Sequence, residues 1–337
     1  MSKRKLTRRQ SWRIEKIQKE REKRASRRDD KADEKLGESD LGQEQEGLIV
    51  THYGTQVMVE DAATREAKRC HFRSNLGGLV TGDKVIWRDG NPFGVVVARI
   101  DRATSLMRPD PYGDMKAVAA NIDRIAIVVA PYPEPHFNLI DRYLVAAEAI
   151  GIEPALVINK VDLIDDQQRD KVANIQALYT SLGYTVILAS ATQDHGLEPL
   201  RDYLSHFTSV FVGQSGVGKS SLVNALLPKA NIRVGELSER QTGTHTTTNA
   251  TLYDIPSGGR LIDSPGIREF GLWHVEPEDV LAGFKEFRPF MGGCKFRDCS
   301  HSHEPGCAIL QALDDGKITE GRLDGYRRIL ADMHPNR

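Results

Sequence analysis

A glycine-rich octapeptide near the middle of the chain constrains its fold more than any other feature. Residues 213–220 read GQSGVGKS and match the pattern G-x-x-x-x-G-K-[ST] in full. The octapeptide follows the apolar run SVFVG and opens the amphipathic segment GKSSLVNALL, so it joins a predicted strand to a predicted helix. In that setting the backbone N–H groups of the loop and the helix N-terminus can hold a phosphate. The chain is therefore predicted to contain an α/β nucleotide-binding domain; the alternative is a chance glycine turn.

Two side chains at the end of this loop are predicted to act on the bound phosphates. Lys219 would reach the β- and γ-phosphates and take part in catalysis, and the hydroxyl of Ser220 would bind Mg²⁺. The residues expected to surround the phosphates are Gly213, Gln214, Ser215, Gly216, Val217, Gly218, Lys219, Ser220 and Ser221.

A second motif indicates which base the nucleotide carries. Asn159-Lys160-Val161-Asp162 follows the apolar run ALVI, so it lies where a predicted strand ends. A carboxylate such as that of Asp162 can accept hydrogen bonds from N1–H and the 2-amino group of guanine, whereas adenine offers neither donor. Selectivity of this type is worth about 10⁴-fold or more. Asn159, Lys160, Val161 and Asp162 are therefore predicted to bind guanine, with the stem of Lys160 along the ring.

Two shorter motifs complete the nucleotide site, although each is weak alone. Ser190-Ala191 follows the run TVIL, where a backbone N–H would contact O6 of guanine. Asp263-Ser264-Pro265-Gly266 follows the run GGRLI. There Asp263 would reach Mg²⁺ through water, and the N–H of Gly266 would sense the γ-phosphate.

The segment between the phosphate loop and Asp263 is predicted to be a switch loop. Residues 241–248, QTGTHTTT, are polar and show no core pattern. One threonine of this segment should complete the coordination of Mg²⁺ and so assist catalysis. Thr247 is favoured, with Thr246 and Thr248 as alternatives.

The residue that follows the D-x-x-G motif predicts slow intrinsic hydrolysis. Many GTPases place there a glutamine that orients the attacking water, but this chain has Ile267, which cannot bond to water. Hydrolysis should therefore be slow without another group or a partner. His245 is the candidate catalytic residue, and the alternative is an exposed loop histidine.

The motifs occur in an unusual order along the chain. NKVD and SA precede the phosphate loop, which precedes DSPG, whereas ordinary GTPases begin with the phosphate loop. Because a pocket is an arrangement in space, and domains with neighbouring termini tolerate permutation, this order is compatible with a single nucleotide site. From about residue 122, apolar runs alternate with amphipathic segments, which predicts a mostly parallel sheet covered by helices.

The region before this domain has a different pattern. Residues 47–103 contain short β-rich runs separated by Gly, Asn and Asp, which predicts a small barrel of the OB type. Such barrels bind single-stranded nucleic acid through exposed aromatic and basic side chains. The candidates are Tyr53, His71, Phe72, Arg73 and Trp87, although each aromatic can equally belong to the core. Cys70 is predicted to be a small core residue.

Three of the four cysteines lie in one short segment near the C-terminus. Cys294, Cys299 and Cys307, with His301 between them, have the spacing C-x₄-C-x-H-x₅-C. Three thiolates and one imidazole make a closed tetrahedral Zn²⁺ site, which is structural because no position is left for water. His303 competes for the fourth position, and three unrelated cysteines are the alternative to a metal site.

Charge is segregated along the chain. The formal net charge is −1, but residues 1–28 hold 13 Lys/Arg and three acids and so carry +10, and the rest carries −11. Residues 1–46 are too polar to bury a core and should be largely disordered. The basic part is interpreted as an arm for nucleic-acid phosphates, and a solubilising tail is the alternative. With no membrane span and no secretory signal in the sequence, a cytoplasmic protein is expected.

Together these motifs resemble one family, the circularly permuted GTPases of the RsgA (YjeQ) type. The resemblance rests on the order NKVD, SA, GQSGVGKSS, GTHTTT, DSPGIREFG and on the zinc-loop spacing. After the extension (1–46), it implies three parts: an OB-fold RNA-binding domain (47–103), a circularly permuted GTPase domain (104–273) and a helical zinc-binding domain (274–337). It also favours His301 over His303 as the fourth zinc ligand.

The resemblance further implies a function. The chain would bind GTP and GDP with Mg²⁺, carry one structural Zn²⁺, and hydrolyse GTP slowly until stimulated by the small (30S) ribosomal subunit. It would contact 16S rRNA late in assembly of that subunit, as a monomer that binds neither DNA nor membrane. Two alternatives stay open. One is an rRNA-binding module or RNA chaperone that GTP merely stabilises. The other is a metabolic or tRNA-modifying GTPase, which the absence of a further catalytic domain disfavours.

Overall fold

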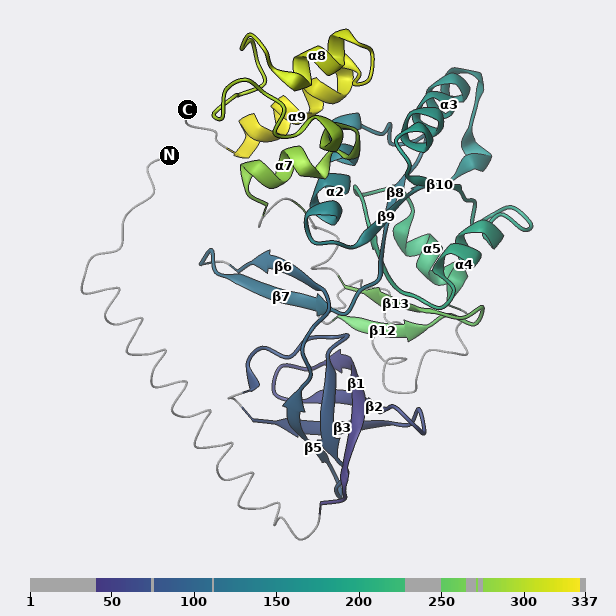
Figure 1. The fold of residues 1–337 in the computed structure, drawn as a ribbon. Coiled ribbons are helices and arrows are strands. Elements are labelled where there is room, and N and C mark those ends of the chain that lie inside the picture. The colour runs from purple at the N-terminus through teal and green to yellow at the C-terminus, as the bar shows by residue number, and fades with distance from the viewer. Residues whose placement is uncertain are drawn as a thin grey trace, which may run out of the picture. The chain divides into compact units, whose positions relative to one another are not determined.

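The computed structural model describes residues 41–73, 76–110, 112–227, 250–264, 271 and 275–333 (Figure 1). They fall into two compact units. The first runs to Leu79 and continues over Asp83–Asp101, and the second combines Val80–Gly82 with the chain from Arg102 onward. Residues 1–40 of the predicted extension lie outside the described residues. Within the described part of the chain, no helix combines the length and apolarity needed to cross a bilayer.

The first unit is a small β-barrel, as the short β-rich runs predict. Its described strands are β1 (Glu44–His52), β2 (Val57–Asp61), β3 (Ala67–Phe72), β4 (Lys84–Arg88) and β5 (Gly94–Arg99). β1 pairs antiparallel with both β2 and β4, β2 with β3, and β4 with β5. A parallel pairing of β3 with β5 closes the circuit. This strand order is that of an OB-type barrel.

Alternation along the barrel strands decides which aromatic residues face solvent. On β4, Val85 and Trp87 point inward, and Trp87 is only 3% exposed. Trp87 is therefore a core residue, which corrects its place among the candidate RNA contacts. Tyr53 is 36% exposed and lies under the guanidinium of Arg69, and Arg73 is exposed. Cys70 is fully buried in the barrel core, as predicted, and burial raises the pKa of its thiol to about 12.

The second unit is built on a mostly parallel sheet. Its strands are β8 (Arg124–Val129), β9 (Glu153–Ile158), β10 (Thr185–Leu188), β11 (Thr208–Val212), β12 (Thr251–Asp254) and β13 (Arg260–Asp263). Their order across the sheet is β10-β9-β8-β11-β13-β12, and only β12 runs antiparallel to its neighbour. The connecting helices are α2 (Phe137–Ala149), α3 (Asp166–Ser181), α4 (Glu198–Leu204) and α5 (Lys219–Leu226).

The apolar runs form these strands because both faces of the sheet are covered. Ala126, Val128, Ala155 and Val157 point to one face, where they pack with residues of α4 and α5 such as Leu200 and Leu222. Ile125 and Ile127 alternate with them on β8 and are fully buried as well. The alternation of strand and helix thus confirms the predicted α/β domain, with its motifs in permuted order.

A hairpin that the sequence did not suggest precedes this sheet. Its strands, β6 (Ser105–Pro109) and β7 (Met115–Ala120), pair antiparallel with Ser105 opposite Ala120. The Asp110 carboxylate accepts hydrogen bonds from the N–H groups of Tyr112 and Asp114, at 2.8 and 3.0 Å, and this fixes the turn. Tyr112, near the tip, is 78% exposed.

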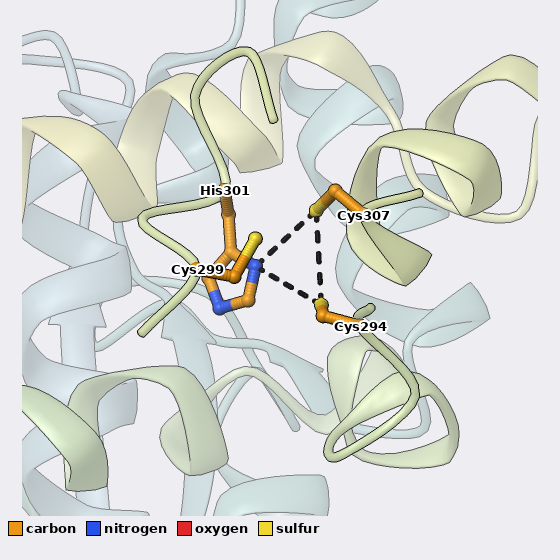
Figure 2. A group of neighbouring side chains, drawn as sticks. All are labelled: Cys294, Cys299, His301 and Cys307. Atoms are coloured by element: carbon orange, nitrogen blue, oxygen red, sulfur yellow. Dashed lines mark hydrogen bonds between the residues drawn. The ribbon is translucent and has the colours of Figure 1, made fainter. Parts of the chain in front are cut away.

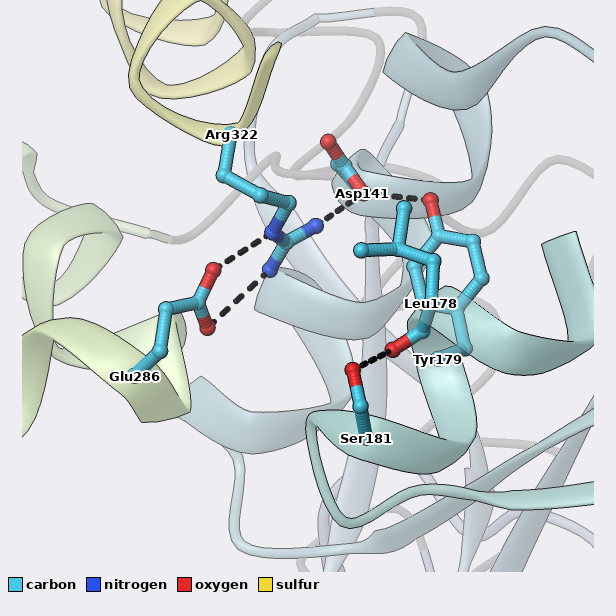
Figure 3. Close-up of polar contacts among 6 residues, drawn as sticks. All are labelled: Asp141, Leu178, Tyr179, Ser181, Glu286 and Arg322. Carbon is cyan, nitrogen blue, oxygen red and sulfur yellow. Dashed lines mark hydrogen bonds and ion pairs between the residues drawn. The ribbon is translucent and has the colours of Figure 1, made fainter. Parts of the chain in front are cut away.

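The C-terminal region is helical and packs against α2 as part of the second unit (Figure 1). Its helical segments are α7 (Pro277–Gly283), η6 (Lys285–Phe290), α8 (Ala308–Asp314) and α9 (Glu320–Met333). A buried ionic cluster lies at this contact (Figure 3). There Arg322 of α9 binds both Asp141 of α2 and Glu286 of η6, and the hydroxyl of Tyr179 donates to Asp141.

Candidate functional site

The predicted nucleotide motifs gather at one edge of the sheet. NKVD follows β9, SA follows β10, the phosphate loop follows β11, and Asp263 is the last residue of β13. These strands are parallel, so their carboxyl ends lie at the same edge. That edge is where ligands bind in open α/β sheets.

The glycines of the phosphate loop are required by close backbone approaches. Gly213 has φ +138°, and a Cβ there would lie 2.2 Å from the carbonyl oxygen of Val128. Gly218 has φ +94°, and its Cβ would lie 2.4 Å from Nδ2 of Asn159. Both separations are far below contact distance, so a side chain at either position would force the loop open. The loop can therefore adopt this tight form only with these glycines.

Lys219 begins α5 and folds back over the loop. Its Nζ donates to the carbonyl oxygens of Gly213 and Gln214, each at 2.6 Å. The ammonium group thus lies at the mouth of the phosphate loop, where a triphosphate would meet it. Ser220, the next residue of the helix, is partly buried, and Ser221 is exposed.

Asn159 joins the base-reading loop to the phosphate loop. It is 1% exposed, and its Nδ2 donates to the carbonyl oxygen of Val217 at 2.9 Å. Its Oδ1 is also buried, yet no group of the described residues bonds to it. Buried polar atoms are nearly always paired, so this oxygen is an acceptor available to a ligand at the site.

Lys160 makes a second link between the two loops. It adopts a left-handed backbone conformation, φ +59°, and its Nζ donates to the carbonyl oxygen of Gly216 at 2.6 Å. A weaker bond, 3.3 Å, reaches the carbonyl oxygen of Tyr132 after β8. The aliphatic stem of Lys160 is thus stretched between the loop that would read the base and the loop that would hold the phosphates. Val161 and Asp162 follow in a short 3₁₀ turn.

The carboxylate of Asp162 is exposed and already oriented. Oγ of Ser190 donates to its Oδ1 at 2.5 Å, and this hydrogen bond holds the pKa of Asp162 below its usual value. Ser190 itself is fully buried, whereas Ala191 is exposed. Asp162 therefore stands ionised beside the second base-contact motif, with acceptor capacity left for a ligand.

Part of the predicted site falls outside the described residues. His245, Thr246, Thr247, Thr248, Gly266 and Ile267 belong to the stretches 228–249 and 265–270 that the structure does not describe. Their predicted roles in catalysis, in Mg²⁺ binding and in sensing the γ-phosphate stay predictions.

The three C-terminal cysteines and one histidine converge between η6 and α8 (Figure 2). Their ligand atoms all lie within 4.8 Å of one another. Sγ of Cys294 is 3.9 Å from Sγ of Cys307 and 3.6 Å from Nδ1 of His301. In a tetrahedral Zn²⁺ site the sulfurs lie about 3.8 Å apart and a sulfur and a nitrogen about 3.6 Å apart. The donor set and its spacing therefore fit zinc.

Surrounding residues hold the histidine of this cluster in place. His301 is 9% exposed, and burial lowers the pKa of its imidazole, which favours the neutral form that a metal ligand needs. Its backbone, at φ +57°, is fixed by Arg327 of α9, whose Nη2 donates to the carbonyl oxygen of His301 at 3.1 Å. His303 is exposed and lies outside the cluster. The structure thus brings the three cysteines together with His301, the histidine that the family resemblance favoured.

Known proteins match this chain over nearly its whole length. A family model described as RsgA GTPase matches residues 99–273, which is more than half of the chain. A small ribosomal subunit biogenesis GTPase RsgA from Pseudomonas aeruginosa is 58% identical over 335 residues, covering 99% of this chain and 98% of that protein. The chain belongs to the RsgA GTPase family. Because the members of that family are GTPases, the chain is a GTP hydrolase.

Further relatives and solved structures agree with this family. The protein of the same name from Pseudomonas fluorescens SBW25 is 57% identical over 338 residues, 99% of this chain and 98% of its own length. YjeQ from Thermotoga maritima has a TM-score of 0.73 at 33% identity, over 88% of this chain and all of that one (100%). YloQ, a circularly permuted GTPase, has a TM-score of 0.70 at 30% identity, over 88% of this chain and 96% of its own.

Two residues contact the nucleotide loops of this RsgA-family chain without belonging to any of the predicted motifs. Tyr132 binds Lys160 through its carbonyl, and its hydroxyl donates to Asp165 at 2.8 Å. Oγ1 of Thr192 lies 3.0 Å from Oγ of Ser190. A weak signal pointed to each: Tyr132 stands two positions after Ala130, where a buried apolar run ends, and Thr192 directly follows the SA motif.

Proposed function

We propose that this chain binds GTP at the carboxyl edge of its sheet, hydrolyses it to GDP and phosphate, and thereby acts in biogenesis of the small ribosomal subunit. The observation that carries the proposal is the direct bonding of the base-reading loop to the phosphate loop. Asn159 bonds to Val217 and Lys160 bonds to Gly216, so one nucleotide can touch both loops. Relatives that match the chain end to end are named small ribosomal subunit biogenesis GTPases, which supports the choice of partner.

In this proposal the guanine is read by the NKVD and SA residues. Asp162 accepts from N1–H and the 2-amino group, Asn159 bonds the other edge of the base, and the stem of Lys160 lies along the ring. A backbone N–H at Ser190-Ala191 donates to O6 of the base. Adenine would leave the Asp162 carboxylate without donors, and this would select against ATP.

The hydrolytic step is an in-line displacement at the γ-phosphorus. Water forms the new bond to that phosphorus, the bond to the β–γ bridging oxygen breaks, and GDP leaves. Lys219 stabilises the charge that develops on the phosphates, and His245 orients the water, since Ile267 cannot. Mg²⁺, when bound, neutralises charge on the β- and γ-phosphates. The hydroxyls of Ser220 and Thr247 and the carboxylate of Asp263, through water, are the oxygen donors that such a hard cation prefers.

The C-terminal cluster would hold one structural Zn²⁺. Cys294, Cys299, Cys307 and His301 supply four ligands, and a site closed in this way offers no position for a reacting water. The ion would fix the loop between η6 and α8 and take no part in hydrolysis.

The partner would be the small (30S) ribosomal subunit with its 16S rRNA, met in the cytoplasm late in subunit maturation by a monomeric enzyme. The +10 charge of residues 1–28 supports contact with RNA phosphates. Ile267 in place of a glutamine supports slow intrinsic hydrolysis that the subunit accelerates. The competing function is an rRNA-binding module or RNA chaperone in which turnover is incidental, and Ile267 is equally compatible with it.

Single-turnover hydrolysis separates the two functions. Enzyme in excess over GTP is mixed with purified small subunits, with large subunits, or with buffer, and released phosphate is followed. The proposed function predicts acceleration by small subunits alone. Equal rates in all three mixtures would leave the binding module as the better description.

A further inference from the structure

Thr192 and Ser190 form a short hydrogen-bonded chain that ends on the base-reading carboxylate. Oγ of Ser190 lies 2.5 Å from Oδ1 of Asp162 and 3.0 Å from Oγ1 of Thr192. The backbone N–H groups of Thr192 and Gln193 also point to Oγ of Ser190, each at 3.3 Å. All of these groups lie in two loops, one after β9 and one after β10.

Counting protons gives this series of hydrogen bonds a direction. A hydroxyl has one proton to donate, and an ionised carboxylate can only accept. The short bond to Asp162 therefore uses the proton of Ser190. The Ser190 oxygen can then only accept in its pair with Thr192, so the Thr192 hydroxyl is the donor there, and Thr192 also acts directly on the Asp162 carboxylate. The order is Thr192 to Ser190 to Asp162, and a hydroxyl that itself accepts a hydrogen bond becomes a stronger donor.

The backbone of the loop is held independently of the Thr192 side chain. The N–H of Ser190 donates to the carbonyl oxygen of Gly196 at 3.0 Å, and the N–H of Gly196 donates to that of Gln193 at 3.1 Å. A Cβ at Gly196 would lie 2.5 Å from the Ser190 carbonyl oxygen, so the turn closes tightly there. The hydroxyl of Thr192 is thus not needed to form the turn, and its side chain is exposed.

We infer that Thr192 is a positioning residue for guanine selection, acting through Ser190 to hold the Asp162 carboxylate in the orientation that the two guanine donors require. The inference rests on the proposed GTP site at NKVD. Asp162 is exposed and lies within a short 3₁₀ turn, so its carboxylate would otherwise rotate freely about its terminal bond. A hydrogen bond from Ser190 to one carboxylate oxygen fixes the plane of the carboxylate and so the position of its second oxygen. A correctly placed pair of acceptors distinguishes guanine from hypoxanthine, which lacks the 2-amino group.

The test compares GDP with inosine diphosphate, because inosine keeps N1–H but loses the 2-amino donor. Binding of both to the full chain is measured by titration calorimetry for wild type, Thr192→Val and Thr192→Ser. Valine has the shape of threonine without the hydroxyl, and serine keeps the hydroxyl. Thr192→Val should weaken GDP binding about three- to ten-fold, the size of one lost hydrogen bond, and inosine diphosphate binding clearly less. Thr192→Ser should keep the wild-type ratio of GDP affinity to inosine diphosphate affinity.

Two further variants decide between the outcomes. In a Ser190→Ala background, Thr192→Val should change the ratio of GDP to inosine diphosphate affinity less than it does in wild type, because only the direct effect of Thr192 on Asp162 is left. An unchanged ratio in Thr192→Val, or an equal effect with and without Ser190, would overturn the role of Thr192. The Asp162→Ala variant tests the site itself. If this variant keeps the preference for GDP, the proposed guanine site is wrong. If it loses that preference while Thr192→Val leaves the ratio of GDP to inosine diphosphate affinity unchanged, only the role of Thr192 is refuted.

Discussion

The nucleotide loops and the Cys/His cluster are both loops held together by polar groups, but they are supported in different ways. The nucleotide loops extend from β9 and β11, whose residues Val157 and Val212 are fully buried, so the sheet positions them without any ligand. The loop around the cluster joins two short helical segments, η6 and α8, and Lys295, Phe296 and Arg297 within it are exposed. The nucleotide loops therefore do not need a ligand in order to fold, whereas a metal in the Cys/His cluster would be part of the fold.

Removing zinc should have the largest effect on the molecule. A structural zinc contributes on the order of 10 kcal/mol to folding in zinc-finger peptides near neutral pH, because no apolar core replaces it. Chelation of the metal, or the variant Cys299→Ser, should therefore unfold the loop between η6 and α8. It should also raise hydrogen exchange in α8 and α9. The measurements are zinc content by elemental analysis and hydrogen exchange followed by mass spectrometry.

The two histidines of the loop provide a matched control. His301→Ala should behave like Cys299→Ser, and His303→Ala should keep full zinc content, since His303 is exposed and outside the cluster. Guanine preference should survive in all of these variants. If zinc removal abolished that preference, the two regions would not be independent.

A change at Asp162 should produce the opposite pattern, with binding altered and the fold intact. Asp162→Asn replaces one acceptor by a donor and so opposes the guanine 2-amino group. Preference for GTP over ATP should fall by about 10³- to 10⁴-fold. The exposed position predicts that the midpoint of thermal unfolding hardly changes. Competition binding of the two nucleotides and a thermal melt of the same sample measure both quantities.

Asp166→Asn is the matched control for that variant. Asp166 begins α3 only four positions further along, and its side chain is 91% exposed in an ion pair with Arg169. It should leave nucleotide preference unchanged. Unaltered discrimination in Asp162→Asn itself would remove the base-reading role from this residue.

The same contrast explains what the sequence could and could not predict. The phosphate loop and NKVD were predictable because each is a local motif at the end of an apolar strand, so chain order alone places them at one sheet edge. Which imidazole joins the cysteines depended on the backbone turn at His301 and on Arg327 of a distant helix. Spacing alone therefore left His301 and His303 equivalent.

Two other features were out of reach because they depend on tertiary context. The β6–β7 hairpin lies in a proline-containing stretch of mixed polarity whose turn is fixed by the side chain of Asp110. The bond between Arg322 and Asp141 joins residues 181 positions apart, and each one alone reads as part of a solvated helix face. Gly325 shows how close this contact is, because a Cβ there would lie 2.7 Å from Oδ2 of Asp141.

Arg322→Met tests how firmly the two regions are joined. Arg322, Asp141 and Glu286 have side chains that are 3%, 2% and 9% exposed, so methionine would leave two buried carboxylates without their cation. Breaking such a cluster costs about 3–5 kcal/mol. Chemical unfolding monitored by circular dichroism should show this loss, while zinc content and guanine preference of the folded fraction should stay near wild type.

A second variant separates lost charge from lost packing. Arg322 also stacks on Phe284, with its guanidinium carbon 4.4 Å from the ring centroid. The combined change Arg322→Met, Asp141→Asn, Glu286→Gln removes every charge of the cluster and keeps similar volumes. It should regain part of the stability that Arg322→Met loses. A triple variant as unstable as the single one would assign the loss to packing.

The smallest effect is expected one residue along α2, at an ion pair that joins the same helices. Nη1 of Arg142 binds Oδ2 of Asp332 at 2.5 Å, but these side chains are 34% and 51% exposed. Water competes for both charges, so Arg142→Ala should cost only about 0.2–1 kcal/mol, and less at high salt. The measurement is the same chemical unfolding at low and high salt. A cost equal to that of Arg322→Met would mean that the rim of this contact, and not its buried centre, joins the C-terminal helices to the nucleotide domain.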